Sequence, residues 1–169
     1  LAQSLKFLPR IDKTLTDGVN KLLSGGDIKG AVAVLESPAL GGDARASFLL
    51  ADIYMNAKEH QDYALARKWL GVSAAQGERD ALYQMGVMYE RGLGVDRDLN
   101  EAVRWFRLAA DQRDAQAQLN LGILHDPRAN GVAKNPEAAA QWFMLSANNG
   151  NARAKHILEN FYDRKSNAK

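Results

Sequence analysis

The hydrophobic positions of this chain recur with the period of an amphipathic helix, and the same pattern returns at a fixed distance. Tryptophan occurs at 69, 105 and 142, so the separations are 36 (105 − 69) and 37 (142 − 105) residues. Around each tryptophan, small or apolar residues stand at offsets 0, 3, 4, 7 and 8, which form one face of a helix. The pattern predicts an internal repeat of two helices.

The tryptophan helices share their start signals as well as their apolar face. The three copies read Ala66-x-x-Trp69-Leu70-x-x-Ser73-Ala74, Ala102-x-x-Trp105-Phe106-x-x-Ala109-Ala110 and Ala139-x-x-Trp142-Phe143-x-x-Ser146-Ala147. A degenerate copy, Ala31-x-x-Val34-Leu35-x-x-Pro38-Ala39, precedes them, and we expect Pro38 to end its helix one or two residues earlier. Residues able to cap the first turn stand in register before all four helices, at Asp27, Asp62, Asp98 and Asn135.

A second helix precedes each tryptophan helix, and a last one closes the chain. The segments 43–54, 78–89, 114–125 and 151–162 align without gaps. Five residues after a shared alanine, the first three segments carry a small residue: Ala51, Gly86 and Gly122. A small residue there lets neighbouring helices approach closely. The last segment has Glu159 instead, which suits a capping helix whose outer side meets water.

Composition narrows the classes of function. The chain is 46% hydrophobic and 25% charged, with 14 Gly and 4 Pro, as expected for a globular, largely helical protein. A formal net charge of +2, with both signs interspersed, argues against a nucleic-acid partner. The absence of cysteine excludes disulfides, a thiolate nucleophile and cysteine-ligated zinc. No run of apolar residues approaches the roughly 18 of a membrane span.

The middle copy carries a specific resemblance. It reads Ala81-x-Tyr83-x-Met85-Gly86-x-Met88-Tyr89-x-x-Gly92-x-Gly94-Val95-x-x-Asp98-x-x-x-Ala102-x-x-Trp105-x-x-x-Ala109-Ala110. This resembles the Sel-one-like repeat family, a relative of the tetratricopeptide repeat. The resemblance covers about residues 43–162 as three repeats and a capping helix. Residues 11–42 are similar to a degenerate tetratricopeptide-like helix pair, 1–10 form an extension or cap, and 163–169 form a polar tail.

The resemblance implies an all-α fold: a right-handed α/α superhelical solenoid of about nine helices. It implies a non-enzymatic adaptor, scaffold or regulatory subunit that binds another protein, frequently in bacterial systems. One branch of the family is cysteine-rich, and this chain departs from that branch. The alternative function is a bacterial envelope accessory factor that binds cell-wall glycan or works with exopolysaccharide machinery. The compartment, bacterial periplasm or envelope or else cytoplasm, stays open.

Most residues that suggest chemistry have a structural explanation. The repeat pattern assigns seven residues to the structural core: Trp69, Trp105, Trp142, Tyr54, Tyr89, Gly86 and Gly122. Gly92-x-Gly94 follows a helix, which indicates a helix C-cap instead of a phosphate loop. His60, His125 and His156 lie in different repeats and lack metal-ligand spacing. We therefore predict no catalytic, cofactor or metal site.

The remaining candidate surface lies opposite the apolar stripe of the first helix of each repeat. Offsets −1, 2, 6 and 9 from the shared alanine fall together there, and in the related tetratricopeptide fold this side lines a concave groove. Such a groove would bind a peptide or helix of a partner protein. Phe48, Tyr83 and Leu119 could instead pack between repeats. The groove residues are Arg45, Phe48, Asp52, Met55, Asp80, Tyr83, Val87, Glu90, Gln116, Leu119, Ile123, Asp126, Arg153, His156 and Asn160.

Overall fold

A computed structural model describes residues 13–129, 131–132 and 134–162, and the predicted N-terminal extension and polar tail lie outside these ranges. All secondary structure in the described part is helical, which confirms the predicted all-α class. The α-helices are α1 (Lys13–Ser24), α2 (Ile28–Leu40), α3 (Ala44–Asn56), α4 (Tyr63–Ala74), α5 (Arg79–Arg91), α6 (Leu99–Asp111), α7 (Ala115–His125), α8 (Pro136–Asn148) and α9 (Ala152–Ile157). A 3-10 turn η2 (Lys58–His60) follows α3, and a π-helical turn η3 (Leu158–Tyr162) follows α9.

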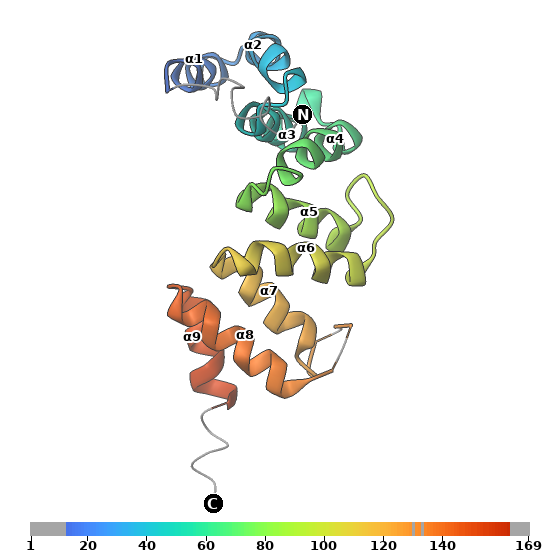
Figure 1. Cartoon of the computed structure of the whole chain (residues 1–169), viewed down its shortest axis with the longest axis vertical. Coiled ribbons are helices and arrows are strands. Elements are labelled where there is room, and N and C mark those ends of the chain that lie inside the picture. Colours follow the sequence, from blue (N-terminus) through green and yellow to red (C-terminus); the bar gives the residue numbers. More distant parts are fainter. Residues whose placement is uncertain (1–12, 130, 133, 163–169) are drawn as a thin grey trace, which may run out of the picture. The chain divides into compact units, whose positions relative to one another are not determined.

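The chain divides into two compact units, Leu1–Ala81 and Leu82–Lys169, and the boundary falls in the first turn of α5. In the first unit, α3 packs between α2 and α4, and α1 packs on α2 (Figure 1). In the second unit, α7 packs between α6 and α8, and α9 packs on α8 (Figure 1). Within each unit these helices thus pack on their neighbours in sequence, as expected for a repeat array.

The predicted capping residues stabilise the starts of the second helices. The Asp62 carboxylate accepts from Ala64 N and Leu65 N, both at 2.9 Å. Asp98 and Asn135 cap α6 and α8 in the same way, and Asp27 caps α2. These bonds satisfy amides that have no partner within the helix.

A backbone hydrogen bond closes the loop between the two helices of every repeat. In each case the N–H of the residue that caps the second helix donates to a carbonyl near the end of the first helix. The three bonds are Asp62 N to Tyr54 O at 2.8 Å, Asp98 N to Tyr89 O at 3.0 Å, and Asn135 N to His125 O at 2.9 Å. We call this bond the loop clasp.

Two close helix contacts of the second unit pair a glycine with a phenylalanine. A Cβ built on Gly86 would lie 2.5 Å from the Phe106 ring, and one on Gly122 would lie 2.5 Å from the Phe143 ring. Both rings are fully buried. The small residues predicted from the alignment therefore serve close approach, and the atoms that approach them belong to phenylalanine.

The tryptophans are less central than their periodicity predicts. Trp69 is buried at 8% exposure, whereas Trp105 and Trp142 are half-buried, as are Tyr54 and Tyr89. At 100° per residue, the tryptophan falls at the edge of its apolar stripe, and the residue after it lies near the middle. The large, fully buried side chain of each stripe is accordingly that of the residue after tryptophan: Leu70, Phe106 or Phe143.

Pro38 does not end its helix early, so that prediction is wrong. Helix α2 runs through Pro38 to Leu40. Proline lacks one backbone N–H donor, and here the helix continues for two residues beyond it. The last turn is held by the bonds from Gly41 N to Ser37 O and from Asp43 N to Pro38 O, both at 3.0 Å.

Candidate functional site

The candidate groove residues of the first unit lie mostly at the surface. Arg45 is exposed, and its guanidinium carbon lies 5.7 Å from the centre of the half-buried Phe48 ring. Exposed Asp52 accepts a hydrogen bond of 2.7 Å from Asn56 Nδ2. Asp80, also exposed, pairs with its neighbour Arg79. Met55, in contrast, is buried at the end of α3.

In the second unit, helix α5 presents three half-buried groove residues, Tyr83, Val87 and Glu90. The Tyr83 ring lies 5.7 Å from that of Phe106, centre to centre. Burial raises the pKa of Tyr83, and a hydrogen bond from Asn120 opposes this shift. Burial also raises the pKa of Glu90, because the carboxylate loses solvation that Arg91 and Arg97 only partly replace.

Polar side chains connect three helices across this face. Asn120 on α7 hydrogen-bonds Tyr83 on α5. Gln116 donates to Asn120 at 3.3 Å and accepts from Asn151, the N-cap of α9, at 3.4 Å. The face therefore carries a row of amides, which can also hydrogen-bond an extended peptide backbone.

Leu119 does not belong to the groove, which corrects its assignment. The side chain is 1% exposed and packs in a core cluster with Ala139, Phe143 and Ala154. Helices α8 and α9 supply these neighbours, so the apolar residue at this offset is covered. Asp126 is buried too, whereas Gln116, Arg153 and His156 are exposed and Ile123 and Asn160 are half-buried.

Three of the predicted groove residues, Ile123, Asp126 and Arg153, line one hollow. Ile123 of α7 and Arg153 of α9 border a cavity of about 370 Å³, together with Phe143 and Ile157. The loop after α7 contributes Asp126, Arg128 and Ala129. We call this the α7–α9 pocket. Sequence periodicity predicted Asp126 but missed Arg128 and Ala129, because a helical period carries no information about a loop.

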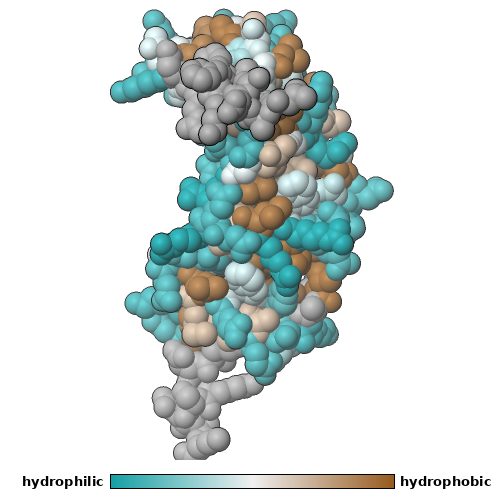
Figure 2. Space-filling model, viewed as in Figure 1, coloured by the Kyte–Doolittle hydropathy of each residue, from teal (hydrophilic) through white to brown (hydrophobic). Residues whose placement is uncertain are grey.

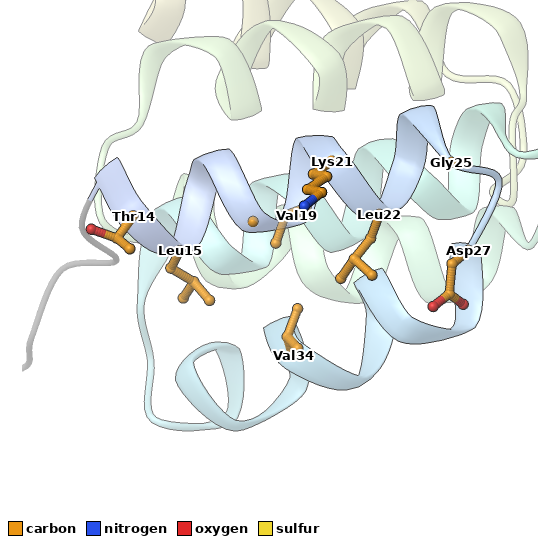
Figure 3. Close-up of a pocket in the computed structure, with 9 residues that line it drawn as sticks. Thr14, Leu15, Val19, Lys21, Leu22, Gly25, Asp27 and Val34 are labelled. Atoms are coloured by element: carbon orange, nitrogen blue, oxygen red, sulfur yellow. The ribbon is translucent and has the colours of Figure 1, made fainter.

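A larger cavity lies elsewhere, between α1 and α2 in the first unit. It measures about 720 Å³ and is mostly apolar. Figure 3 shows Leu15 and Leu22 on α1 and Val34 on α2 directed into the same space. Val34 stands where the three repeats carry tryptophan, and it is 40% exposed. Valine at a position where the repeats have tryptophan is the sequence signal that could have indicated this cavity.

The other candidates for chemistry keep structural roles. Gly92 has φ +71°, and the next amide, Leu93 N, donates to Met88 O at 2.9 Å, as in a helix C-cap. His125 is buried, with Nδ1 2.8 Å from Leu121 O. Within residues 13–129, 131–132 and 134–162 there is no group of three His, Cys, Asp or Glu residues able to hold a metal. In the same part of the chain, no helix combines the length and hydropathy needed to cross a bilayer.

Exposed apolar residues are distributed in small patches. Figure 2 shows hydrophobic areas separated by hydrophilic ones on the face in view. Among the described residues, the large hydrophobic side chains with high exposure are all aliphatic: Val34, Leu40, Leu108, Val132, Met144 and Leu145. Such patches favour contacts with apolar protein side chains over the aromatic stacking that sugars need.

Comparison with known proteins supports the repeat assignment. The chain is 32% identical over 101 residues to DAP3-binding cell death enhancer 1 of Rattus norvegicus, a match that covers 60% of this chain and 20% of that protein. The protein of the same name from Mus musculus is 31% identical over 109 residues, covering 64% and 21%. The chain thus spans about a fifth of the length of these relatives.

Solved structures show the same fold. A Sel1 repeat protein from Oxalobacter formigenes is similar with a TM-score of 0.77 and 28% identity, over 88% of this chain and 62% of that one. The c5321 protective antigen of uropathogenic Escherichia coli, which displays an SLR fold, has a TM-score of 0.76 and 34% identity, over 82% and 30%. The model of the Sel1 repeat matches residues 44–78, 79–114 and 115–151. The predicted repeats are therefore confirmed, and the chain belongs to the Sel1 repeat family.

Proposed function

We propose that this chain is a non-enzymatic interaction module that binds a peptide or helix of a partner protein through the face carrying Tyr83, Val87, Gln116 and Arg153. Proteins of this family are generally protein–protein interaction modules. The name of the mammalian relatives records a protein partner, DAP3, for those proteins. Both facts support a protein ligand.

The observation that carries the proposal is the convergence of Ile123 and Arg153 on the α7–α9 pocket. Beside the pocket, the amides of Gln116 and Asn120 extend toward Tyr83. An apolar hollow beside a row of hydrogen-bonding amides suits a peptide, since a peptide presents side chains and backbone polar groups together. The exposed aliphatic residues give no comparable support for a glycan ligand.

The test compares affinity capture from a native lysate by the wild-type chain and by two variants, with quantitative mass spectrometry. Tyr83→Ala/Val87→Ala removes the α5 part of the face, and Gln116→Arg/His156→Glu changes only exposed residues. Proteins retained by the wild type should be lost from both variants, provided circular dichroism shows that each remains folded. Arg107→Ala, at an exposed site on α6, is the control. Equal recovery by all chains, or retention on glycan without any protein, would contradict the proposal.

A further inference from the structure

The floor of the α7–α9 pocket is apolar and comes from three helices. Ile123 lies on α7, Phe143 on α8 and Ile157 on α9. With a volume of about 370 Å³, the pocket accommodates a few side-chain groups and not an extended ligand. The part of a partner that enters it is therefore one aliphatic side chain with its immediate neighbours.

The charged side chains at the rim of the pocket differ in whether they already have an ion-pair partner. The Asp126 carboxylate is held by Arg128 in a two-point ion pair, with Arg128 Nε 2.8 Å from Asp126 Oδ1 and Nη2 on Oδ2. The backbone N–H of Arg128 donates to the same carboxylate at 2.9 Å. Asp126 is also buried, so it has little capacity left to recruit a cationic ligand.

Arg153 is the rim charge that stays available. It is exposed, and no hydrogen bond or ion pair joins it to any residue that the structure describes. Ile157 follows it one turn later and lies on the same side of α9. Lys155 lies on the other side of α9 and pairs with Glu159 at 4.0 Å. The pocket thus presents an apolar floor beside one unmatched positive charge.

We propose that the α7–α9 pocket binds a peptide segment that carries an aliphatic side chain next to an acidic one. The aliphatic group covers Ile123 and Ile157, and the carboxylate bonds to the Arg153 guanidinium. Guanidinium–carboxylate pairs form short, charge-assisted hydrogen bonds in a fixed geometry, so the arginine selects for the acid. This inference rests on the proposed function and adds to it the chemistry of the partner.

The test uses a phage-displayed library of random dodecapeptides selected on the full chain. Enriched peptides should combine Leu, Ile, Val or Met with an adjacent Asp or Glu. For a synthetic peptide of the enriched sequence, Arg153→Gln should weaken binding about tenfold, the scale of one charge-assisted contact. Lys155→Gln, on the opposite side of α9, should leave the affinity unchanged.

A paired substitution in the peptide identifies the contact. Changing its acid to the corresponding amide should weaken binding to the wild type by the same factor and have no further effect on Arg153→Gln. Enriched peptides without an acid, or with affinity independent of Arg153, would overturn the inference and leave the proposed function standing. The inference would also be overturned if the library yielded no peptide, or if the enriched peptides bound Ile123→Ser and Arg153→Gln as tightly as the wild type. In either case the lysate experiment alone would decide the proposed function.

Discussion

The first repeat and the two that follow solve the same packing problem with different residues. Where repeats two and three place glycine against phenylalanine, the first repeat has Ala51 and Leu70, both fully buried. One added methyl on one helix accompanies a smaller side chain on the other. A further difference lies nine residues after the shared alanine, where Met55 is buried and Glu90 is a half-buried carboxylate. Equivalent positions of the repeats thus carry different side chains.

The largest expected effect tests which residue fills the core of the second repeat. Phe106→Ala empties a fully buried site and should lower the free energy of unfolding by about 3–5 kcal/mol. Trp105→Ala should cost less, because the indole is partly exposed whereas the Phe106 ring is fully buried. Urea unfolding followed by circular dichroism measures both. A larger loss for Trp105→Ala than for Phe106→Ala would show that the tryptophan carries the packing after all.

A second prediction concerns the glycine that faces Phe106. Gly86→Ala gains up to about 1 kcal/mol of helix propensity, but its methyl would meet the ring at 2.5 Å, and overpacking costs about 1–3 kcal/mol. A net loss of stability is expected. Gly71→Ala is the matched control, since a Cβ there meets nothing within 4 Å, and it should stabilise α4 by about 0.5–1 kcal/mol. If both variants gained stability equally, close approach would not be the reason for Gly86.

The alanine–leucine pair of the first repeat can be transferred to the second. Phe106→Leu in the Gly86→Ala background should recover part of the lost stability, because the shorter side chain makes room for the methyl. A double-mutant cycle measured by urea unfolding gives the coupling directly, and contacting residues typically couple by about 0.5–3 kcal/mol. If the stability effects of Gly86→Ala and Phe106→Leu simply added, residues 86 and 106 would not be coupled, and the comparison with Ala51 and Leu70 would fail.

The smallest expected effect depends on pH at Glu90. Its pKa is raised above the ordinary 4.5 by burial, so the folded state binds the proton more tightly than the unfolded state. The stability of the wild type relative to Glu90→Gln should therefore fall as pH rises from 4.5 through the folded-state pKa. At lower pH the two proteins should differ by a constant amount. Thermal unfolding of both proteins across this pH range measures the difference in stability. A difference that does not change with pH would show that burial does not raise the pKa of Glu90.

Much of the fold follows from the sequence because few residues determine it. The tryptophan spacing set the repeat, and Asp62, Asp98 and Asn135 marked helix starts that the structure places within a residue. Periodicity located each apolar stripe but not its centre, so it favoured Trp105 over Phe106. Pro38 misled because the end of a helix before proline is only a statistical tendency, and backbone bonds from Gly41 and Asp43 hold the last turn of α2.

The candidate site was less predictable. The helical wheel placed Ile123 and Arg153 on one face, and the structure gives them a shared pocket. It also placed Leu119 there, although α9 covers this residue through Ala154. The position of a residue in the repeat predicts the side of the helix on which its side chain lies. Whether that side chain is buried depends on the residues that the neighbouring helix places against it. The loop residue Arg128 lay beyond any periodic argument.

The loop clasp has a consequence for how the repeat can change. It joins residues eight (62 − 54), nine (98 − 89) and ten (135 − 125) positions apart with the same backbone bond. Because the bond uses main-chain atoms, it does not depend on the loop side chains, and doubling a loop's length costs only about 0.6 kcal/mol in closure entropy. A change in loop length therefore need not change the packing of the two helices. A foreign segment grafted between Gly92 and Asp98 would add a new recognition element to a scaffold that keeps its geometry.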